Sequence, residues 1–563
     1  MSILGVLAFV GTIGVECADR GSWQIALEPC ASPAEGVKVV KLVATNAVAA
    51  VPPAFTVKFT VPKGKLQHVW DPFEERFPCC WTRQDSSFSR GLPLRVNFDD
   101  DDTNVLTLAV SDALNPIVFD TSVDMRNANG HAIDVSASFF GEADVPRTRY
   151  EALLRLDTRP VFWSEAAEDG VRWISSASAR PPCVPPPAAY EPLYSSWYVF
   201  RQTVTEEALD EELVRAAALG MKVVILDDGW QTDRGDWGVN TNKFPTLKAH
   251  VARAHALGMK YMMWFAVPHL LPTSPAWERF KGMRLSEKPD SWGDYIFDPR
   301  RPEVRAHLVR RLTELARDYD LDGFKLDFID QFVPQGGDDY ARAHGFAGCD
   351  CRSVPEAVER LLKDIRAALD AVKPGMLVEF RQKYVGPVIR QYGNMLRAND
   401  CPGDYEANRY RTLALRVTSP GSAVHSDMLM WRADDPVSEV WRQIWNVAFS
   451  TVQYSAHLGT LPAEHLTAVR EAIRFTTAHR RTLLFGKLRP HRPDLGYPCV
   501  EAESDGERIV VVYAPEHVVR LPKDAKPTVL VNATTAGSLV VDCGGRLERL
   551  QIPSGGFREK AEF

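Results

Sequence analysis

The stretch DGFKLDFID, residues 322–330, places four charged side chains in a short and otherwise apolar run. Side chains two positions apart in a β-strand point to the same face of the sheet, so Lys325 and Asp327 are expected to project together. They are either a buried ion pair of the core or part of a site. Asp322 suits a turn ahead of the strand, and Asp330, which is out of phase with Asp327, suits the loop that follows.

This strand is one of a series that alternates with helices between residues 193 and 482. Amphipathic stretches with Glu–Arg or Glu–Lys pairs at helical spacing separate most of the strands, and residues 268–300 form a long insertion after the third. Eight strand–helix units predict a (β/α)8 TIM barrel, assigned to residues 186–482. The strand candidates are YSSWYVF, KVVILDDG, KYMMWFAV, GFKLDF, LVEFR, NMLRAND, AVHSDML and TVQYSA.

The segments on either side of the barrel have the pattern of β-domains. Residues 1–185 hold short β-branched strands separated by Asn, Asp, Gly and Pro, which predicts an all-β N-terminal β-sandwich that ends in a proline-rich linker at residues 179–192. Residues 483–563 predict a small C-terminal β-sandwich. The fold class is therefore multidomain, with a central TIM barrel between two β-domains.

Composition excludes several classes of partner. The 563-residue chain carries a net charge of −7 and no long basic run, which disfavours nucleic acid. Apolar runs are too short for a membrane helix. Ten cysteines without zinc-like spacing indicate reduced thiols, hence a cytoplasmic location and no structural zinc. The apolar start of the chain favours a first pair of β-strands over an export signal, which stays an alternative.

The carboxyl ends of the strands should carry the active site, because that is where it lies in (β/α)8 barrels. No HxH or HExxH motif accompanies the carboxylates there, which makes a metal site the weaker explanation. Two opposed carboxylates suit glycoside hydrolysis, in which an ionised acid attacks and a protonated acid donates. Lys325 would keep Asp327 ionised, whereas the second acid needs surroundings that raise its pKa. The strand-end residues are Asp227, Asp228, Trp264, His269, Lys325, Asp327, Glu379, Arg381, Arg397, Asp400, His425 and Asp427.

Several blocks in a fixed order make residues 194–430 resemble glycoside hydrolase family 36, the α-galactosidase or melibiase-like family in the clan shared with families 27 and 31. The blocks are VVILDDGW (223–230), GDWGVNTNKFPTLKAH (235–250), HALGMKYMMWF (255–265), FDPRRPEVRAHL (297–308), GFKLDF (323–328), AND with CPGD (398–404), NR (408–409) and VHSD (424–427).

The resemblance implies a retaining exo-α-glycosidase that needs no cofactor and no metal. It makes Asp327 the nucleophile and Asp400 the acid/base, with Asp404 as a rival acid. The substrate-binding candidates are Asp227, Asp228, Trp264, Lys325, Arg381 and Arg397. Supporting roles are expected for Glu379, His425 and Arg409, although His425 also fits a satisfied barrel histidine and Arg381 could instead pair with Glu379.

The chain departs from the family pattern at three strand ends. AVPHL stands where Glu-Pro-Glu follows the third strand, and VEFRQKYVG replaces the Cys-Ser-Gly-Gly run of the fifth. Arg381 and Lys383 thus replace small residues, and Asn399 and Cys401 replace Ser and Asn. A basic pocket residue could accept a carboxylate or sulfate, so an acidic or modified α-glycoside is an alternative substrate.

Two more functions are compatible with the same residues. One is transglycosylation, and the second is carbohydrate binding by a catalytically inactive relative. An oligosaccharide or another glycoside is the expected partner in each case. The sugar, the linkage and the oligomeric state, with a homo-oligomer as one option, are left open by the sequence.

Overall fold

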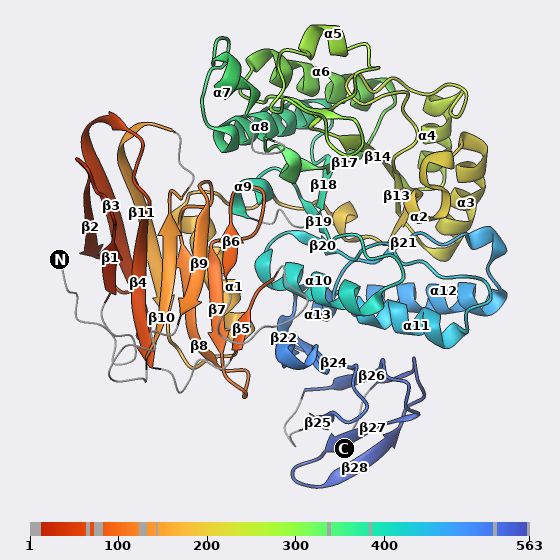
Figure 1. The fold of residues 1–563 in the computed structure, drawn as a ribbon. Coiled ribbons are helices and arrows are strands. Elements are labelled where there is room, and N and C mark those ends of the chain that lie inside the picture. Colours follow the sequence, from red (N-terminus) through yellow and green to blue (C-terminus); the bar gives the residue numbers. More distant parts are fainter. Residues whose placement is uncertain are drawn as a thin grey trace.

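Three bodies lie side by side in a computed structural model of the chain: a β-sandwich, a barrel and a small β-domain (Figure 1). Of the segment predicted to start the chain with a pair of β-strands, residues 1–21, residues 1–12 lie outside the described residues, and Ile13–Glu16 is a strand that pairs with Phe55–Pro62. Lys383 also lies outside the described residues. The structure describes residues 13–62, 68–72, 83–122, 132–141, 145–334, 339–381, 386–521 and 526–559.

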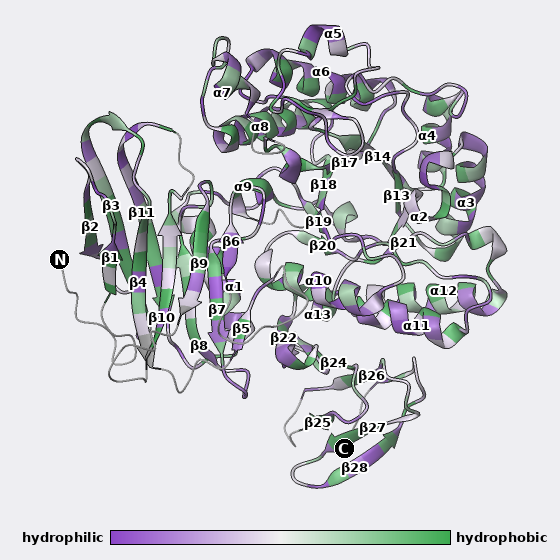
Figure 2. Cartoon of the chain, viewed as in Figure 1, coloured by the Kyte–Doolittle hydropathy of each residue, from purple (hydrophilic) through white to green (hydrophobic). Residues whose placement is uncertain are grey.

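The N-terminal β-sandwich packs a five-stranded sheet on a six-stranded one. Apolar side chains from the facing sides form its core, and the strands show the mixed colouring of alternating sequences (Figure 2). The first sheet has the order β1 (Ile13–Glu16), β4 (Phe55–Pro62), β10 (Ala132–Phe139), β9 (Ile117–Ser122), β6 (Gln84–Ser86). The second has the order β2 (Gln24–Pro29), β3 (Val37–Ala50), β11 (Arg147–Asp157), β8 (Asn104–Val110), β7 (Leu94–Phe98), β5 (His68–Trp70).

The prediction that residues 1–185 are all-β is wrong, because helix α1 spans Trp163–Ala177. Its buried positions recur at helical spacing, and the helix packs against β7 and β8 and also touches α10 of the barrel. Gly170 permits the close approach, since a Cβ atom there would lie 2.7 Å from Cδ1 of Leu94. An interpretation with the strand period of 2 overlooks this helix, which joins the sandwich to the rest of the molecule.

The central barrel has the eight predicted strands, all parallel, in chain order around the sheet. A parallel bridge between His425 and Thr451 nearly closes it. The predicted fold class is therefore confirmed. The strands are β12 (Leu193–Ser195), β13 (Val223–Leu226), β14 (Lys260–Ala266), β17 (Gly323–Asp327), β18 (Leu377–Arg381), β19 (Met395–Arg397), β20 (Ala423–His425) and β21 (Gln453–Tyr454).

Helices surround the barrel, and several begin at a side-chain cap. Thr205, Ser353 and Asp404 accept hydrogen bonds from backbone N–H groups in the first turns of α3, α8 and α10. The insertion after β14 holds β15 (His269–Leu270), α5 (Trp277–Phe280) and β16 (Tyr295–Ile296). The outer helices are α3 (Glu206–Leu219), α4 (Leu247–Ala256), α6 (Pro302–Asp318), α8 (Val354–Val372), the short α9 (Pro387–Arg390), α10 (Tyr405–Thr418), α11 (Val437–Asn446) and α12 (Ala463–Ala478).

Short elements complete the connections around the barrel. Before and after β12 they are the 3-10 turns η2 (Pro187–Tyr190) and η3 (Arg201–Thr203) and the helix α2 (Trp197–Phe200); later ones are η4 (Ile329–Gln331), α7 (Tyr340–His344), η6 (Leu458–Thr460) and α13 (Arg480–Phe485).

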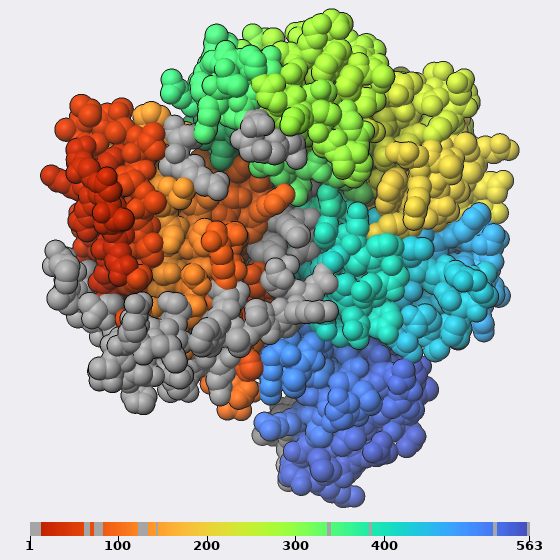
Figure 3. All heavy atoms as spheres, viewed as in Figure 1, coloured from red at the N-terminus to blue at the C-terminus, as the bar shows by residue number. Residues whose placement is uncertain are grey.

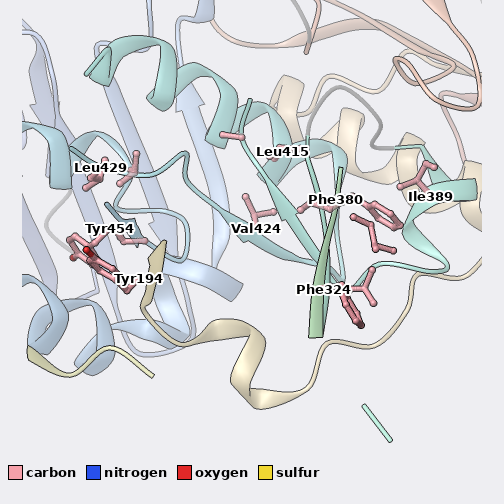
Figure 4. Close-up of a cluster of buried hydrophobic side chains, with 14 of the residues drawn as sticks. Tyr194, Phe324, Phe380, Ile389, Leu415, Val424, Leu429 and Tyr454 are labelled. Atoms are coloured by element: carbon pink, nitrogen blue, oxygen red, sulfur yellow. The ribbon is translucent and has the colours of Figure 1, made fainter. Parts of the chain in front are cut away.

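The barrel strands bury two different sets of side chains. One set faces the helices and is apolar; Phe324, Phe380 and Ile389 lie at one end of this layer and Tyr194 and Tyr454 at the other (Figure 4). The inward set changes along the strands. It begins with an apolar floor and becomes charged toward the carboxyl ends, so the pocket rests on a closed base. The floor contains Leu193, Val223, Ile225, Met262, Leu377, Met395 and Ala423.

The C-terminal domain is a second pair of β-sheets with its own apolar core. One sheet has the order β22 (Lys487–His491), β23 (Cys499–Glu503), β24 (Arg508–Val512), β26 (Thr528–Asn532), β29 (Phe557–Arg558), with the turn η7 (Pro493–Leu495) after β22. The other has the order β25 (Val518–Arg520), β27 (Ser538–Asp542), β28 (Leu547–Gln551).

Buried hydrogen bonds tie the outer domains to one another. Trp70 Nε1 donates to the Tyr497 hydroxyl at 3.0 Å, and Trp163 Nε1 donates to the Pro490 carbonyl at 3.1 Å. In the space-filling view the sandwich lies directly against the barrel (Figure 3). None of the helices in the described residues is long and apolar enough to cross a membrane.

Candidate active site

A pocket of about 770 Å³ opens at the carboxyl ends of the barrel strands. It brings together both predicted catalytic carboxylates and five of the six predicted substrate-binding residues. Arg397, Glu379, His425 and Arg409 do not line it. The lining residues are Trp197, Gln202, Asp227, Asp228, Arg234, Trp264, His269, Trp292, Lys325, Asp327, Phe328, Asp330, Gln331, Arg381 and Asp400.

Asp327, at the end of β17, is buried and held by three donors. Its Oδ1 accepts from the Phe328 N–H at 2.8 Å and from Arg381 Nε at 2.9 Å, and its Oδ2 accepts from Trp264 Nε1 at 3.0 Å. Burial acts to raise the pKa of Asp327, but the charges of Arg381 and Lys325 and the Trp264 bond outweigh it and hold the pKa well below its ordinary value. Asp327 is therefore ionised over the whole physiological range.

The expected pairing of Lys325 with Asp327 is not what the structure contains. Lys325 Nζ donates instead to Asp227 Oδ2 at 2.6 Å, across the barrel mouth on β13. The cation in direct contact with Asp327 is Arg381. Lys325 still faces the same side as Asp327, but its charge acts on that carboxylate from a distance.

The turn after β13 presents both of its carboxylates to the pocket. Asp228 Oδ2 accepts from Gln202 Nε2 at 2.7 Å, and its Oδ1 accepts from the Gln231 side chain. Gly229 makes this turn possible, because it has a φ of +118° and a Cβ there would lie 2.7 Å from the Gln202 Cα. Asp227 and Asp228 thus supply hydrogen-bond acceptors deep in the pocket.

Asp400, just beyond β19, is the more exposed of the two proposed catalytic acids. Its side chain is 47% exposed, and its Oδ1 lies 2.8 Å from Arg397 Nη2. Burial acts to raise the pKa of Asp400, but the charges of Arg397, Lys325 and Arg381 outweigh it and lower the pKa. This differs from the expectation that the surroundings of the acid/base raise its pKa, because the sequence does not reveal how many cations meet here.

The rival acid Asp404 has a structural task. Its side chain accepts from the Ala407 N–H at 2.9 Å and caps helix α10. It does not line the pocket. Asp400 is therefore the better candidate for the acid/base.

Arg397 lies beneath the pocket rather than in its wall. The guanidinium is buried and pairs with Asp400 and with Asp427, and its Nε lies 3.7 Å from Glu379 Oε1. Asp427 also accepts from the Tyr198 hydroxyl at 2.8 Å. Arg397 thus has protein carboxylates on three sides and does not line the pocket.

Glu379 and His425 belong to the same buried layer. Glu379 accepts from Gln453 Nε2 at 2.6 Å, and burial raises its pKa to about 7. His425 Nε2 lies 2.7 Å from the Ala189 carbonyl, and burial lowers its pKa to about 4, so the neutral ring donates to that carbonyl. The alternative that Arg381 pairs with Glu379 is not observed, since Arg381 turns to Asp327.

Arg409 lies away from the pocket, against the C-terminal domain. Its Nη2 donates to the Gly496 carbonyl at 3.0 Å, and its guanidinium lies 4.4 Å from the centre of the Tyr513 ring. These contacts fix α10 to the C-terminal β-domain.

Arg381 and Asn399, two of the residues that differ from the family pattern, contact each other. Arg381 Nη1 donates to Asn399 Oδ1 at 2.7 Å, while Arg381 Nε holds Asp327. Asn399 directly precedes Asp400. The two proposed catalytic carboxylates are therefore connected through Arg381 and Asn399.

Sequence reasoning missed several residues of the wall. Asp330, predicted to serve the following loop, lines the pocket, because Phe328 adopts a left-handed backbone with φ of +65° and turns the chain. Trp292 lies in the insertion, where no periodic pattern marks it. Gln202 and Arg234 likewise come from connecting segments. His269 differs from these residues, because its place just after the third strand marks it in the sequence.

The sequence predicts no metal site, and two groups in the described residues could hold an ion by proximity. The one at the pocket joins His269, Asp290 and Asp294. Its chemistry fits a cation poorly, because Arg234 Nη2 already lies 2.7 Å from Asp294 Oδ2 and His269 Nε2 bonds Gln331 Oε1 at 2.7 Å. The other group, His68, Asp100 and Asp494, lies outside the pocket.

Comparison with known proteins supports the predicted resemblance. Residues 191–341 match the family model named Melibiase. Alpha-galactosidase 2 of Pediococcus pentosaceus is 28% identical over 145 residues, which are 24% of this chain and 20% of that protein. The 1,4-alpha-glucan branching enzyme GlgB of Mycobacterium tuberculosis is 24% identical over 275 residues, 45% of this chain and 36% of the enzyme. The match thus spans about a fifth of the length of this alpha-galactosidase and about a third of the length of this branching enzyme.

The fold resemblance extends over most of the chain. A variant of the family 36 alpha-galactosidase AgaA from Geobacillus stearothermophilus, solved in complex with raffinose, superimposes with a TM-score of 0.61 at 15% identity. The match covers 89% of this chain and 80% of that one. The likeness to family 36 predicted from the motifs is confirmed, and at this identity the structural match establishes the fold.

Proposed function

We propose that this protein is a retaining exo-α-glycosidase of the α-galactosidase type. The observation that carries the proposal is the pair of carboxylates, Asp327 and Asp400, which line one pocket from strands two apart in the barrel. One of them is buried with three donors, and the other is partly open to solvent. This asymmetry suits a nucleophile and an acid/base.

In the proposed reaction, Asp400 in its protonated form donates to the glycosidic oxygen while Asp327 attacks the anomeric carbon. Oδ1 of Asp327 already accepts two hydrogen bonds and Oδ2 only one, so Oδ2 is the attacking oxygen. A covalent glycosyl-aspartate forms and the leaving group departs as an alcohol. Asp400, now a carboxylate, takes a proton from a water molecule whose oxygen attacks the anomeric carbon. The bond from that carbon to Asp327 breaks, and the sugar leaves with the anomer retained.

The charge balance of the pocket favours a neutral sugar. Its wall carries the five carboxylates Asp227, Asp228, Asp327, Asp330 and Asp400. The three basic side chains in the wall already pair with carboxylates: Arg234 with Asp294, Lys325 with Asp227 and Arg381 with Asp327. An anionic sugar would meet net negative charge, so the acidic-glycoside alternative loses the support that Arg381 gave it.

Glycosyl transfer is the second candidate. The similarity to a 1,4-alpha-glucan branching enzyme covers 45% of this chain, and the same covalent intermediate can react with a sugar hydroxyl in place of water. A catalytically inactive binding relative is less well supported, because both carboxylates are present. The raffinose complex of AgaA supports a neutral α-linked oligosaccharide as the substrate class. A cytoplasmic location is part of the proposal, supported by the eight cysteines in the described residues, all of which are free.

A panel of aryl α-glycosides, with acidic sugars included, tests the proposal. We expect hydrolysis of a neutral α-glycoside, with release of the α-anomer detected by ¹H NMR. Asp327→Ala should abolish this activity. Release of the β-anomer, or full activity of the Asp327→Ala variant, would overturn the mechanism. Product analysis with a sugar acceptor present distinguishes hydrolysis from transfer.

A further inference from the structure

An aromatic wall leads from the exposed rim of the pocket to the nucleophile. The Trp292 and Phe328 ring centres are 5.2 Å apart, and the His269 ring stacks on Phe328 at 4.8 Å. Of the tryptophans in the described residues, only Trp292 is largely exposed, at 57%. Trp292 also lines the pocket, so its apolar ring is open to a ligand there.

The Trp292 ring packs against His269 and Phe328, whose own positions are fixed by hydrogen bonds. His269 is buried and its Nε2 bonds Gln331 Oε1 at 2.7 Å, which connects the insertion after β14 to the turn after β17. Phe328 has a left-handed backbone, with φ of +65°, and its N–H donates to Asp327 Oδ1 at 2.8 Å. Such a conformation costs about 1 kcal/mol in a residue other than glycine, and this cost is borne beside the nucleophile. The wall is therefore built at a fixed place relative to Asp327.

Asp330 extends the wall with an acceptor that the proposed chemistry does not use. It lines the pocket, and its Oδ1 is buried with no hydrogen-bond partner among the described residues. Burial acts to raise its pKa, and Arg381 and Arg90 oppose this with their charges. Because the Asp330 side chain lines the pocket, a ligand hydroxyl that enters there can donate to its carboxylate.

These features fit the two sides of a sugar ring. A pyranose has C–H groups that stack on an aromatic face and hydroxyl groups that donate to a carboxylate. We propose that Trp292 and Asp330 form a subsite for a second sugar ring, next to the ring that Asp327 attacks. A neutral oligosaccharide of at least two rings is then preferred to a glycoside with a small alkyl or aryl group. This inference rests on the proposed glycosidase function.

Two substrates that share the reacting sugar separate the subsite from the catalytic centre. One is the α-glycosyl fluoride of the sugar preferred in the aryl glycoside panel, whose leaving group is a single atom. The other is a disaccharide with the same sugar in α-linkage. Only the disaccharide can occupy a second subsite.

For Trp292→Ala we expect kcat/KM for the disaccharide to fall about 10- to 50-fold, and kcat/KM for the fluoride to stay within about 2-fold of the unmodified protein. Asp330→Asn should lower the disaccharide value about 5- to 20-fold and leave the fluoride value similarly unaffected. Trp292→Phe should recover most of the disaccharide activity. Phe485→Ala is the matched control, because Phe485 is also 57% exposed but does not line the pocket.

Equal losses on both substrates would overturn the inference and place Trp292 around the first sugar. Unchanged disaccharide activity in both variants would also overturn it. In either case the proposed function stands if the Asp327→Ala variant is inactive on the fluoride. If the unmodified protein hydrolyses neither substrate, the proposed function itself fails.

Discussion

Asp327 and Asp400 are the same residue type at the ends of strands β17 and β19, and each contacts an arginine, yet their surroundings differ. Asp327 is buried and accepts three hydrogen bonds, from Arg381, Trp264 and Phe328. Asp400 is 47% exposed and pairs with Arg397. The first arrangement fixes an ionised oxygen in place, and the second leaves a carboxyl group free to exchange protons. The difference between a nucleophile and an acid/base lies in these contacts and not in the residue.

The largest expected effect separates the two acids directly. Asp327→Ala should lower kcat on an aryl α-glycoside about 10⁴-fold or more, because it removes the proposed nucleophile. Asp400→Ala should lose about 10²-fold on a substrate with a good leaving group, which needs little proton donation. Added azide should restore activity to the Asp400→Ala variant with an α-glycosyl azide as product, whereas any azide rescue of the Asp327→Ala variant would give the β-glycosyl azide. Losses of equal size without rescue would contradict the assigned roles.

The connection between the two acids can be broken at Arg381. Arg381→Gln removes the cation in contact with Asp327, so the pKa of Asp327 should rise and the acid limb of the kcat/KM profile should move to higher pH. At neutral pH we expect a loss of about 10- to 100-fold. A pH–rate profile measures both quantities.

Asn399→Ala is the matched variant, because it removes the bond of 2.7 Å between Arg381 and the Asn399 side chain and leaves the contact of Arg381 with Asp327 in place. We expect a loss of about 2- to 5-fold, and less than additive loss when it is combined with Arg381→Gln. An acid limb that does not move in Arg381→Gln would show that the arginine has no part in keeping Asp327 ionised.

The exposure of Asp400 predicts a smaller effect, which is a difference in pH between the basic limb of the kcat/KM profile and the basic limb of the kcat profile. Its pKa is lowered in the free protein, because Arg397, Lys325 and Arg381 outweigh the effect of burial. Since Asp400 must be protonated to act as an acid, the basic limb of kcat/KM should lie at acidic pH. A bound sugar displaces water from this half-open carboxyl group and raises its pKa, so the basic limb of kcat should lie at higher pH. Coincident limbs would contradict this account.

The smallest effect concerns Asp404, four residues from Asp400. Asp404→Ala removes the cap of α10 and should cost about 1 kcal/mol of unfolding free energy, measured by urea titration. The activity per folded molecule should stay within about 2-fold of the unmodified protein, since the side chain does not line the pocket. A loss as large as that of Asp400→Ala would reverse the choice between the two acids.

The barrel is predictable because its pattern is local. All eight strands and the strand-end positions of the pocket residues follow from apolar runs that alternate with amphipathic helices. Helix α1 escapes prediction, because its small and large apolar residues stand within a segment that otherwise has the pattern of a β-domain. The place of Asp330 in the pocket wall escapes it too, because its orientation depends on the left-handed backbone at Phe328, which no propensity rule suggests for that residue.

By itself the sequence determined which strand residues point into the barrel, because strand period and strand direction fix them. Only the tertiary structure decided which charges meet there. Lys325 neighbours Trp264 on one strand and Glu379 on the other, yet its ammonium crosses to Asp227, while Arg381 takes Asp327. Ion pairing inside a barrel depends on distances of a few ångströms between residues as many as 98 positions apart in sequence. Those distances are set by how the strands close around the pocket, and a linear pattern does not contain them.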